Sequence, residues 1–331
     1  MSQQNLPLVL ITHTLPEDWL SSLAGHCRMI VGPVDATSMA PELLEKLPEA
    51  DGMFTLLSIP VNETILSQAP RLRVVSNMAV GFDNIDLAAC TRRGIPVGNT
   101  PGVLTEGTAD LTFALLLAAA RRLPEASNDA REGRWTTWSP AGWLGADLHG
   151  ACLGIIGMGK IGKAVARRAA AFGMDIFFTD SNPCLEIENG LKATCLQLDD
   201  LLARCDFISL HTPLTPQTRS LIDEKALRKM KPTAILINTS RGSIIDMQAL
   251  GRALKEGWIR AAALDVTDPE PLPPGHPLWS APGCLVSPHV GGDSSAFLPR
   301  AFRLLAAQLR RFADGRPLLN VVGSGTDPAV A

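Results

Sequence analysis

Short apolar runs alternate with longer, more polar segments over most of this chain. Apolar runs that are bounded by turn residues are typical of buried strands, and regular alternation with helical segments is typical of a parallel sheet. In the first hundred residues the pattern predicts strands at residues 8–12, 52–57, 73–77 and 95–97. This first region is therefore predicted to be a small parallel α/β sheet.

A second series of strands follows the turn-rich segment "GNTPG", which is typical of a crossing between domains. The apolar runs predict strands at residues 153–156, 175–179, 206–210, 234–238, 261–265 and 284–287. A final helix over residues 296–315 is expected to pack back on the first region. The pattern as a whole predicts an α/β protein with two parallel sheets.

Composition narrows the classes of partner. The net charge is only −3, and no basic run is present, so we expect no nucleic acid partner. The most apolar stretch, residues 111–120, is too short to span a bilayer and predicts a buried helix. Because that stretch is apolar on all sides, it can also be shared with a second subunit. We expect no contact with a membrane.

The cysteines and the first residues bear on the compartment. Seven cysteines are scattered without a C-x-x-C pair, which is typical of reduced thiols rather than of disulfides or a metal site. The segment "MSQQNLPLVLITH" lacks the basic region and the cleavage site of a signal peptide. These features favour a cytoplasmic protein without a bound metal.

A glycine-rich turn is the first candidate for chemistry. Gly157, Gly159 and Gly162 form G-x-G-x-x-G between a predicted strand and a predicted helix. In a dinucleotide site the first glycine allows the tight turn, the second admits the pyrophosphate, and the third lets helix and strand pack closely. The helix amino terminus, at Lys160 and Ile161, then offers free N–H groups to the phosphates. The alternative is a purely structural βαβ turn.

Asp180 ends the next predicted strand, about twenty residues after the glycine turn. A carboxylate at this place accepts hydrogen bonds from the ribose hydroxyls of NAD, whereas it repels the 2′-phosphate of NADP. The residues that follow, Ser181, Asn182 and Pro183, supply no arginine for that phosphate. The sequence therefore favours NADH over NADPH, unless Asp180 is only a solvated residue at a strand end.

Later strands also end in polar residues, and the carboxyl edge of an open parallel sheet is where ligands bind. This edge is predicted to gather His211, Arg241, Asp265, Glu270 and His289. Arginine binds a carboxylate through two parallel hydrogen bonds, a histidine protonates a carbonyl oxygen, and a carboxylate orients that histidine and favours its charged form. These parts suit the reduction of a keto acid. Each also has a structural alternative, and spacing alone does not decide which histidine faces the substrate.

Four segments in this order resemble the D-2-hydroxyacid dehydrogenase family: "GIIGMGKIG", "NTSRGSIID", "AAALDVTDPEPLP" and "VSPHVGG". The resemblance extends from "NMAVGFDNID" to "GRPLLNVV" and is closest to glyoxylate/hydroxypyruvate reductases through "EGRWTTWSP". It implies two Rossmann-like or flavodoxin-like domains with an active-site cleft between them. The substrate-binding domain is expected to comprise residues 1–100 and 296–331, and the NAD-binding domain residues 101–295.

The resemblance also implies roles for individual residues. Arg241, Glu270 and His289 are implied as the catalytic set, which decides the histidine question in favour of His289. The N–H groups of Val80 and Gly81 are implied to hold the substrate carboxylate with Arg241, and Trp138 to reach the active site of the partner in a homodimer formed through the cofactor domain. Trp138 is equally compatible with an ordinary interface position. The remaining residues expected at the cofactor are Thr105, His211, Thr212, Pro213, Thr239 and Asp265.

The expected activity is NADH-dependent reduction of glyoxylate and hydroxypyruvate to glycolate and D-glycerate. The chain has no tyrosine, which excludes a short-chain reductase with a tyrosine acid. Gly292-Asp293 stands where many members of the family have serine-alanine, so the surroundings of His289 are expected to differ. Two alternatives remain: a dinucleotide-sensing binding protein resembling a corepressor on the same fold, and a dehydrogenase of this family for another 2-hydroxy acid.

Overall fold

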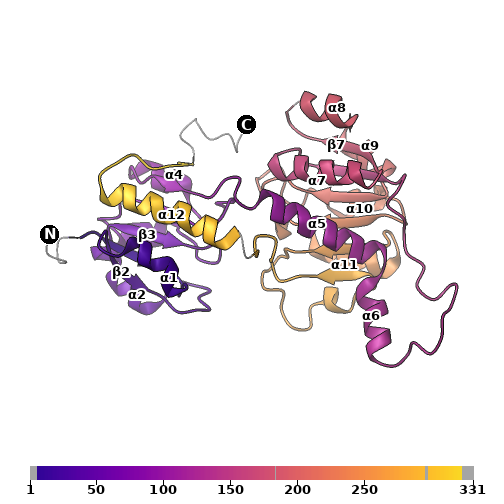
Figure 1. Ribbon diagram of the computed structural model, residues 1–331, viewed down its shortest axis with the longest axis horizontal. Coiled ribbons are helices and arrows are strands. Elements are labelled where there is room, and N and C mark those ends of the chain that lie inside the picture. Colours follow the sequence, from indigo (N-terminus) through magenta and orange to yellow (C-terminus); the bar gives the residue numbers. More distant parts are fainter. Residues whose placement is uncertain (1–5, 183, 295–296, 323–331) are drawn as a thin grey trace. The chain divides into compact units, whose positions relative to one another are not determined.

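The computed structural model describes residues 6–182, 184–294 and 297–322. The chain forms two compact units, of which the smaller comprises residues 1–104 and 294–331 and the larger residues 105–293. Each unit is a parallel sheet with helices on both faces (Figure 1). The chain leaves the smaller unit a few residues after the expected boundary at residue 100, and the expected boundary between residues 295 and 296 lies outside the described residues.

The smaller unit contains five strands in the order β2-β1-β3-β4-β5. They are β1 (Leu8–Ile11), β2 (Arg28–Val31), β3 (Gly52–Thr55), β4 (Val75–Asn77) and β5 (Val97–Gly98). One face is covered by α2 (Pro41–Lys46), α3 (Glu63–Gln68) and α4 (Leu87–Arg92), and the other by α1 (Glu17–Leu20) and α12 (Phe297–Ala313). Successive strand residues pack into opposite cores, because side chains alternate between the two faces of a sheet.

Helix α12 packs on this unit, which confirms the expectation for the last helix. Leu305 and Leu309 are buried together with Val9 and Phe54 of the sheet. The fully buried Gln308 adds polar contacts: its amide oxygen accepts from Ser76 Oγ at 2.7 Å, and its amide nitrogen donates to the carbonyl of Asn99 at 3.1 Å. Two distant parts of the sequence therefore share one core.

The larger unit contains seven strands in the order β12-β11-β10-β9-β6-β7-β8, and every neighbouring pair is parallel. They are β6 (Cys152–Ile156), β7 (Asp175–Thr179), β8 (Thr194–Cys195), β9 (Phe207–Leu210), β10 (Ile235–Asn238), β11 (Ala261–Leu264) and β12 (Cys284–Val286). The helices are α5 (Thr105–Ala120), α6 (Leu123–Arg131), α7 (Lys160–Ala171), α8 (Leu185–Leu191), α9 (Leu198–Arg204), α10 (Glu224–Lys229) and α11 (Met247–Glu256).

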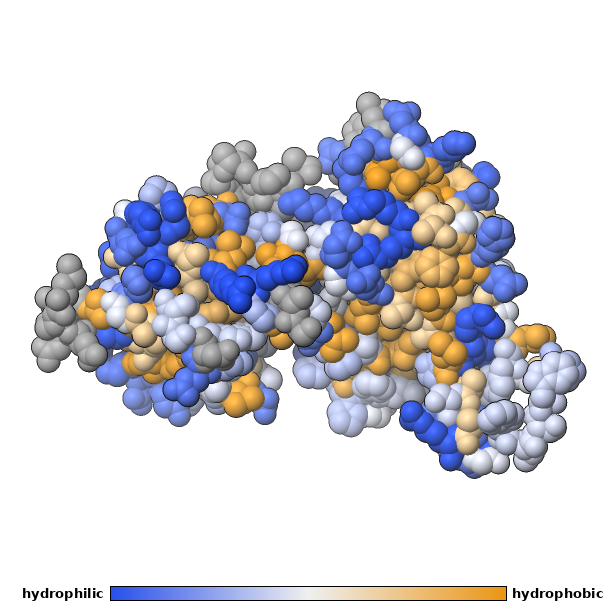
Figure 2. Space-filling view, in the orientation of Figure 1, coloured by the Kyte–Doolittle hydropathy of each residue, from blue (hydrophilic) through white to orange (hydrophobic). Residues whose placement is uncertain are grey.

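Helix α5 is apolar on nearly all sides, as the sequence predicts. Phe113, Leu116 and Ala120 are buried, while Ala114 is exposed and Leu117 half-buried. Figure 2 shows hydrophobic side chains gathered on the surface over α5 and its neighbour α7. Among the described residues, no helix combines the length and apolarity needed to cross a membrane.

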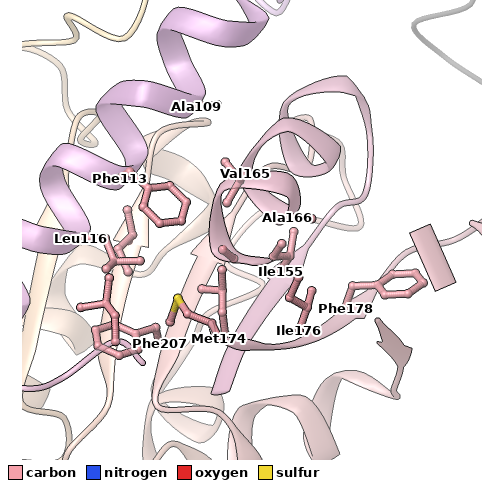
Figure 3. Close-up of a cluster of buried hydrophobic side chains, with 14 of the residues drawn as sticks. Ala109, Phe113, Leu116, Ile155, Val165, Ala166, Met174, Ile176, Phe178 and Phe207 are labelled. Carbon is pink, nitrogen blue, oxygen red and sulfur yellow. The ribbon is translucent and has the colours of Figure 1, made fainter. Parts of the chain in front are cut away.

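The core of the larger unit lies on both faces of its sheet. Ile155 packs with Phe113 and Val165 beneath α5 and α7 (Figure 3), whereas the next residue, Ile156, packs on the opposite face with residues of α9, α10 and α11. This arrangement buries both faces of the strands. Continuous apolar runs are expected in such strands, and the sequence has them.

Two strands were not predicted. β2 is an edge strand with partly exposed side chains, and β8 consists of two exposed residues at the opposite edge of the other sheet. β8 consists of threonine and cysteine and has no apolar run. β2 does carry a short one, at residues 29–31, which the sequence analysis did not interpret as a strand.

Candidate active site

The loops that follow the strands of the larger unit meet at one edge of its sheet, because all of these strands are parallel. The edge carries most of the candidate residues: Gly157 after β6, Asp180 after β7, His211 after β9, Thr239 after β10, Asp265 after β11 and His289 after β12. Arg241 and Glu270 follow β10 and β11, so the five residues that the sequence predicts at one edge, with His211, Asp265 and His289, do follow the carboxyl ends of these strands. The smaller unit carries Val80 and Gly81 beyond the carboxyl end of its strand β4.

The glycine turn has the geometry of a phosphate-binding turn. Gly157 has a φ of 96°, which glycine adopts readily, and the backbone of His211 and Thr212 packs directly against it. A Cβ on Gly162 would lie 2.2 Å from the carbonyl oxygen of Gly157, so helix and strand touch there. A Cβ on Gly159 would meet no protein atom within 4 Å. The turn thus leaves open space beside the amino terminus of α7.

That open space lies next to free donors. Gly159 is the N-cap residue of α7, and no side chain caps the helix. Lys160 and Ile161 are the first residues of the helix, so their N–H groups have no partner within it. An uncapped helix amino terminus beside an empty cradle fits the pyrophosphate of a dinucleotide.

Asp180 is tied to the glycine turn. Its Oδ2 accepts a hydrogen bond from the N–H of Met158 at 2.6 Å, and its Oδ1 accepts from the N–H of Asn182 at 2.9 Å. The carboxylate therefore fixes the conformation of the turn and of the strand end at the same time. It remains half-buried, with its carboxylate at the edge where the ribose would lie.

His211 is held against the sheet and does not carry a charge. Its Nε2 forms a hydrogen bond of 2.8 Å with Ser209 Oγ. Burial lowers the pKa of His211 well below its usual value, so the ring is neutral at neutral pH. The two residues that follow it, Thr212 and Pro213, continue the loop beside the glycine turn.

The loop that carries Arg241 is shaped by the buried Asn238. The Asn238 side chain accepts from the N–H of Ser240 at 3.0 Å and donates to the carbonyl of Arg241 at 2.8 Å. Arg241 Nη1 donates to the carbonyl of Ser240 at 2.8 Å. The next residue, Gly242, lies so close to Thr267 that a Cβ would be 2.0 Å from its carbonyl oxygen. The arginine loop therefore packs on the loop that leads to Glu270.

Glu270 and His289 form a direct pair. His289 Nδ1 contacts Glu270 Oε1, and Glu270 Oε2 accepts from the N–H of Thr267 at 3.3 Å. Because a carboxylate only accepts, Nδ1 carries the proton of this bond. His289 Nε2 has no hydrogen-bond partner among the described residues and is the ring atom left to act on a ligand. Both side chains are partly exposed.

Asp265 holds the turn that presents His289. The Asp265 side chain is 2% exposed, and its Oδ1 accepts from Ser287 Oγ at 2.6 Å and from the N–H of Val290 at 2.9 Å. Its Oδ2 accepts from the N–H of Gly291 at 2.8 Å. His289 itself has a φ of 55°, which is uncommon for a residue other than glycine. Bonds on both sides of the histidine hold it in this conformation.

Helix α5 supports the same edge through two threonines that the sequence analysis did not single out. Thr108 Oγ1 donates to the carbonyl of Gly291 at 3.1 Å, and Thr112 Oγ1 lies 3.0 Å from Thr239 Oγ1. The signal was present as two hydroxyls four residues apart within an apolar helix. Thr105, expected at the cofactor, is the half-buried first residue of α5.

In the smaller unit two asparagines shape the loop of Val80 and Gly81. Asn99 Nδ2 donates to the carbonyl of Val80 at 2.9 Å, and Asn77 Nδ2 donates to the carbonyl of Gly81 at 2.9 Å. Among the described residues, the N–H groups of Val80 and Gly81 have no partner. The sequence analysis missed both asparagines, because Asn99 lies in "GNTPG", which was interpreted only as a crossing, and Asn77 is the last residue of a predicted strand. The loop presents two free donors that suit an oxyanion.

Trp138 lies in the segment that follows α6 and is 80% exposed. It is one of several exposed apolar side chains in this part of the larger unit. The others are Leu123, Trp135, Trp143, Leu144 and Phe172.

The comparisons with known proteins agree with this geometry. The description "D-isomer specific 2-hydroxyacid dehydrogenase, NAD binding domain" matches residues 113–291. A glyoxylate reductase of Aeropyrum pernix is 50% identical over 320 residues, or 96% of each chain. A glyoxylate reductase from Paecilomyes thermophila has a similar crystal structure, with a TM-score of 0.86 and 29% identity over 97% of this chain and 100% of that one.

A further similar structure is the NADPH-dependent glyoxylate/hydroxypyruvate reductase of Sinorhizobium meliloti in complex with NADP and malonate. Its TM-score is 0.84, with 29% identity over 96% of this chain and 97% of that one. The family match covers more than half of this chain, and the relative in Aeropyrum pernix is similar over nearly its full length. The chain therefore belongs to the D-isomer specific 2-hydroxyacid dehydrogenase family.

Proposed function

We propose that this protein reduces glyoxylate and hydroxypyruvate with NADH, forming glycolate and D-glycerate. The observation that carries the proposal is the Glu270–His289 pair at the sheet edge that also holds the glycine turn. Relatives named glyoxylate reductase, at up to 50% identity, support the choice of substrate. The reaction adds a hydride to the carbonyl carbon and a proton to the carbonyl oxygen.

We assign the proton to His289. Its Nδ1–H faces the carboxylate of Glu270, which accepts this bond and fixes the ring. Nε2 is then the atom that gives its proton to the carbonyl oxygen. His211 is unsuited to this role, since burial lowers its pKa and keeps it neutral. Asp265 acts through the turn that carries His289, because its carboxylate already accepts three hydrogen bonds.

The substrate carboxylate needs donors in a fixed arrangement. Arg241 supplies a planar guanidinium, which binds a carboxylate through two parallel hydrogen bonds. We assign a carboxylate-binding role also to the free N–H groups of Val80 and Gly81, which Asn77 and Asn99 orient through the two carbonyls.

NAD is the cofactor that these residues suit, and when bound it supplies the hydride. We place its pyrophosphate in the open space beside Gly159, where the N–H groups of Lys160 and Ile161 are available. We expect Thr105, Thr212, Pro213 and Thr239 to line the rest of the cofactor.

The glycine turn offers a matched pair of substitutions. Gly159→Ala adds a methyl group into space that holds no protein atom, so the thermal stability should not change while NADH affinity falls about tenfold or more, which corresponds to roughly 1.4 kcal/mol. Gly162→Ala forces a Cβ onto the carbonyl of Gly157 and should destabilise the fold by about 1–3 kcal/mol. Thermal unfolding and NADH fluorescence titration measure the two effects. Unchanged NADH binding in Gly159→Ala would rule out this position for the pyrophosphate.

The preference for NADH over NADPH rests on Asp180. A 2′-phosphate carries nearly two negative charges at neutral pH and would lie against this carboxylate. In the wild type, kcat/KM should be higher with NADH than with NADPH. Asp180→Ser should lower the ratio of these two kcat/KM values about tenfold or more. Asp175→Ser, at the exposed start of the same strand, is the control. The NADPH-dependent relative makes the test necessary, and equal kcat/KM values for wild type would refute the preference.

The direct test of function is the loss of NADH absorbance on adding a keto acid. Glyoxylate and hydroxypyruvate should be reduced faster than pyruvate and phenylpyruvate. The alternative, a dinucleotide-sensing protein resembling a corepressor, predicts NADH binding without turnover of any of the four acids. A clear preference for pyruvate or phenylpyruvate would instead indicate a dehydrogenase for another 2-hydroxy acid.

Two variants separate the roles within the histidine–glutamate pair. His289→Asn should lower kcat by about 10²–10⁴-fold, the usual contribution of a positioned acid, and should still bind NADH. Glu270→Gln keeps the shape but removes the carboxylate that accepts from Nδ1–H, so kcat should fall about tenfold or more while NADH affinity stays unchanged. The control is Glu42→Gln, an exposed acid of the other unit. An unchanged kcat in Glu270→Gln would show that Glu270 does not position the acid.

We also propose a homodimer formed through the larger unit. The support is the group of exposed apolar side chains after α6 and the apolar surface over α5 (Figure 2). Sedimentation should give twice the chain mass of 35.3 kDa. If Trp138 reaches the partner's site, Trp138→Ala should raise the rate with phenylpyruvate relative to glyoxylate, whereas the exposed Trp279→Ala should not. A monomer, or an unchanged ratio, would contradict this role.

The protein is further proposed to act in the cytoplasm. All seven cysteines are unpaired, which suits a reducing compartment. Cell fractionation with an antibody tests this assignment, and recovery outside the cytoplasm would overturn it.

A further inference from the structure

A polar cavity lies in the smaller unit, at the amino ends of its strands. Its volume is about 460 Å³, and its walls include Leu6, Arg28, Asp51, Arg71, Arg73 and Phe312. Apart from Phe312 of α12, these residues precede or begin strands β1 to β4, whereas Val80 and Gly81 follow the carboxyl end of β4. The cavity is therefore at the opposite edge of the sheet from the residues assigned to the substrate.

One buried acid organises the arginines of this cavity. Asp51 is 6% exposed, and its Oδ2 accepts from the N–H of Leu8 at 2.9 Å. Its Oδ1 accepts from Arg71 Nη2 at 3.1 Å and from Arg73 Nη2 at 3.5 Å. The carboxylate is thus fixed at the end of the sheet and holds two guanidinium groups at the wall.

Most donors of the three arginines remain unused. Arg73 lies over the Phe312 ring, 4.7 Å from its centroid, and Arg28 Nε donates to the carbonyl of Leu6 at 3.3 Å. Each guanidinium has five N–H donors. Arg71 and Arg73 use only Nη2 and Arg28 only Nε, and the others have no partner among the described residues.

The other acids near the cavity are paired with other bases. Glu49 binds Lys46 Nζ at 2.8 Å, and Asp314 binds Arg316 Nη2 at 2.6 Å. Among the residues that line the cavity, three guanidinium groups face one carboxylate, so its walls carry a net positive charge, although Glu49 lies close enough to interact with Arg28 and Arg71.

We propose that this cavity binds a small phosphorylated metabolite with two or more negative charges. Arginine binds phosphate oxygens through paired hydrogen bonds. The contacts with the Leu6 carbonyl, the Phe312 ring and the Asp51 carboxylate orient the guanidinium groups before a ligand binds. A volume of about 460 Å³ is within the range of small-molecule sites. The proposal is independent of the keto-acid reaction.

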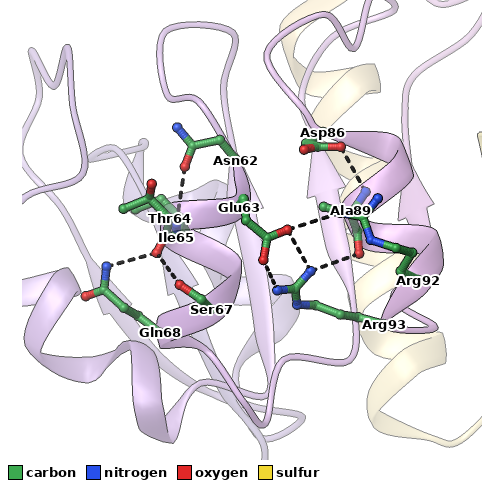
Figure 4. A network of polar contacts seen from close by, with 10 residues as sticks. All are labelled: Asn62, Glu63, Thr64, Ile65, Ser67, Gln68, Asp86, Ala89, Arg92 and Arg93. Atoms are coloured by element: carbon green, nitrogen blue, oxygen red, sulfur yellow. Dashed lines mark hydrogen bonds and ion pairs between the residues drawn. The ribbon is translucent and has the colours of Figure 1, made fainter.

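Isothermal titration with pyrophosphate tests the proposal on the whole chain. NADH is present at saturation, so that the glycine turn does not take up the probe. We expect saturable binding with one site per chain. Arg28→Gln and Arg71→Gln should each weaken it about tenfold or more, whereas Arg92→Gln should not. Arg92 carries the same charge on the same unit but lies on α4 and binds Glu63 Oε2 at 3.2 Å (Figure 4).

Citrate in place of pyrophosphate distinguishes phosphates from polycarboxylates. Binding of citrate without binding of pyrophosphate would overturn the assignment, as would equal weakening in all three variants or no saturable binding at all. If Arg71→Gln unfolds, Arg28→Gln decides, because Arg28 donates only to the carbonyl of Leu6.

Discussion

The candidate active site depends most on the hydrogen bonds that the buried carboxylate of Asp265 accepts. Asp265 follows the carboxyl end of β11 and accepts three hydrogen bonds from the turn that carries His289. His289 adopts a positive φ, which costs free energy unless its surroundings hold it there. Because Asp265 is buried and its bonds are charge-assisted, the turn has few alternatives. The imidazole is thereby fixed against Glu270 before any ligand is present.

Close backbone contacts also fix the conformation of the neighbouring loops. Gly162 packs on the carbonyl of Gly157, and Gly242 packs on the carbonyl of Thr267. The second contact joins loops that are separate in the sequence, and neither contact leaves room for a side chain. The arginine loop is therefore positioned by the loop that leads to Glu270, and a displacement of one would move the other. Thr108 and Thr112 of α5 then tie the same loops to the apolar helix beneath them.

The two units use their sheets in related ways. In the larger unit the carboxyl ends of the strands bear acids, histidines and an arginine. In the smaller unit the carboxyl edge bears a loop whose carbonyls are held by Asn77 and Asn99, so that two N–H groups are left free. The opposite edge of the smaller sheet gathers arginines around Asp51, because parallel strands also collect their amino ends. A parallel sheet thus offers two edges at which charged residues converge.

The sequence by itself determined the α/β class, nearly all of the strands, the glycine turn and the edge at which the polar residues gather. These features follow from local patterns: apolar runs, turn residues and the shared direction of parallel strands. It did not reveal β8, which carries no apolar run, and the short apolar run of β2 at residues 29–31 was not interpreted as a strand. Only the tertiary structure decided that Asp265 holds the His289 turn, that Thr108 and Thr112 brace the loops, and that Asn77 and Asn99 free two donors. Hydrogen bonds between distant segments depend on distances that only the packed chain sets, and the sequence does not record them as a pattern.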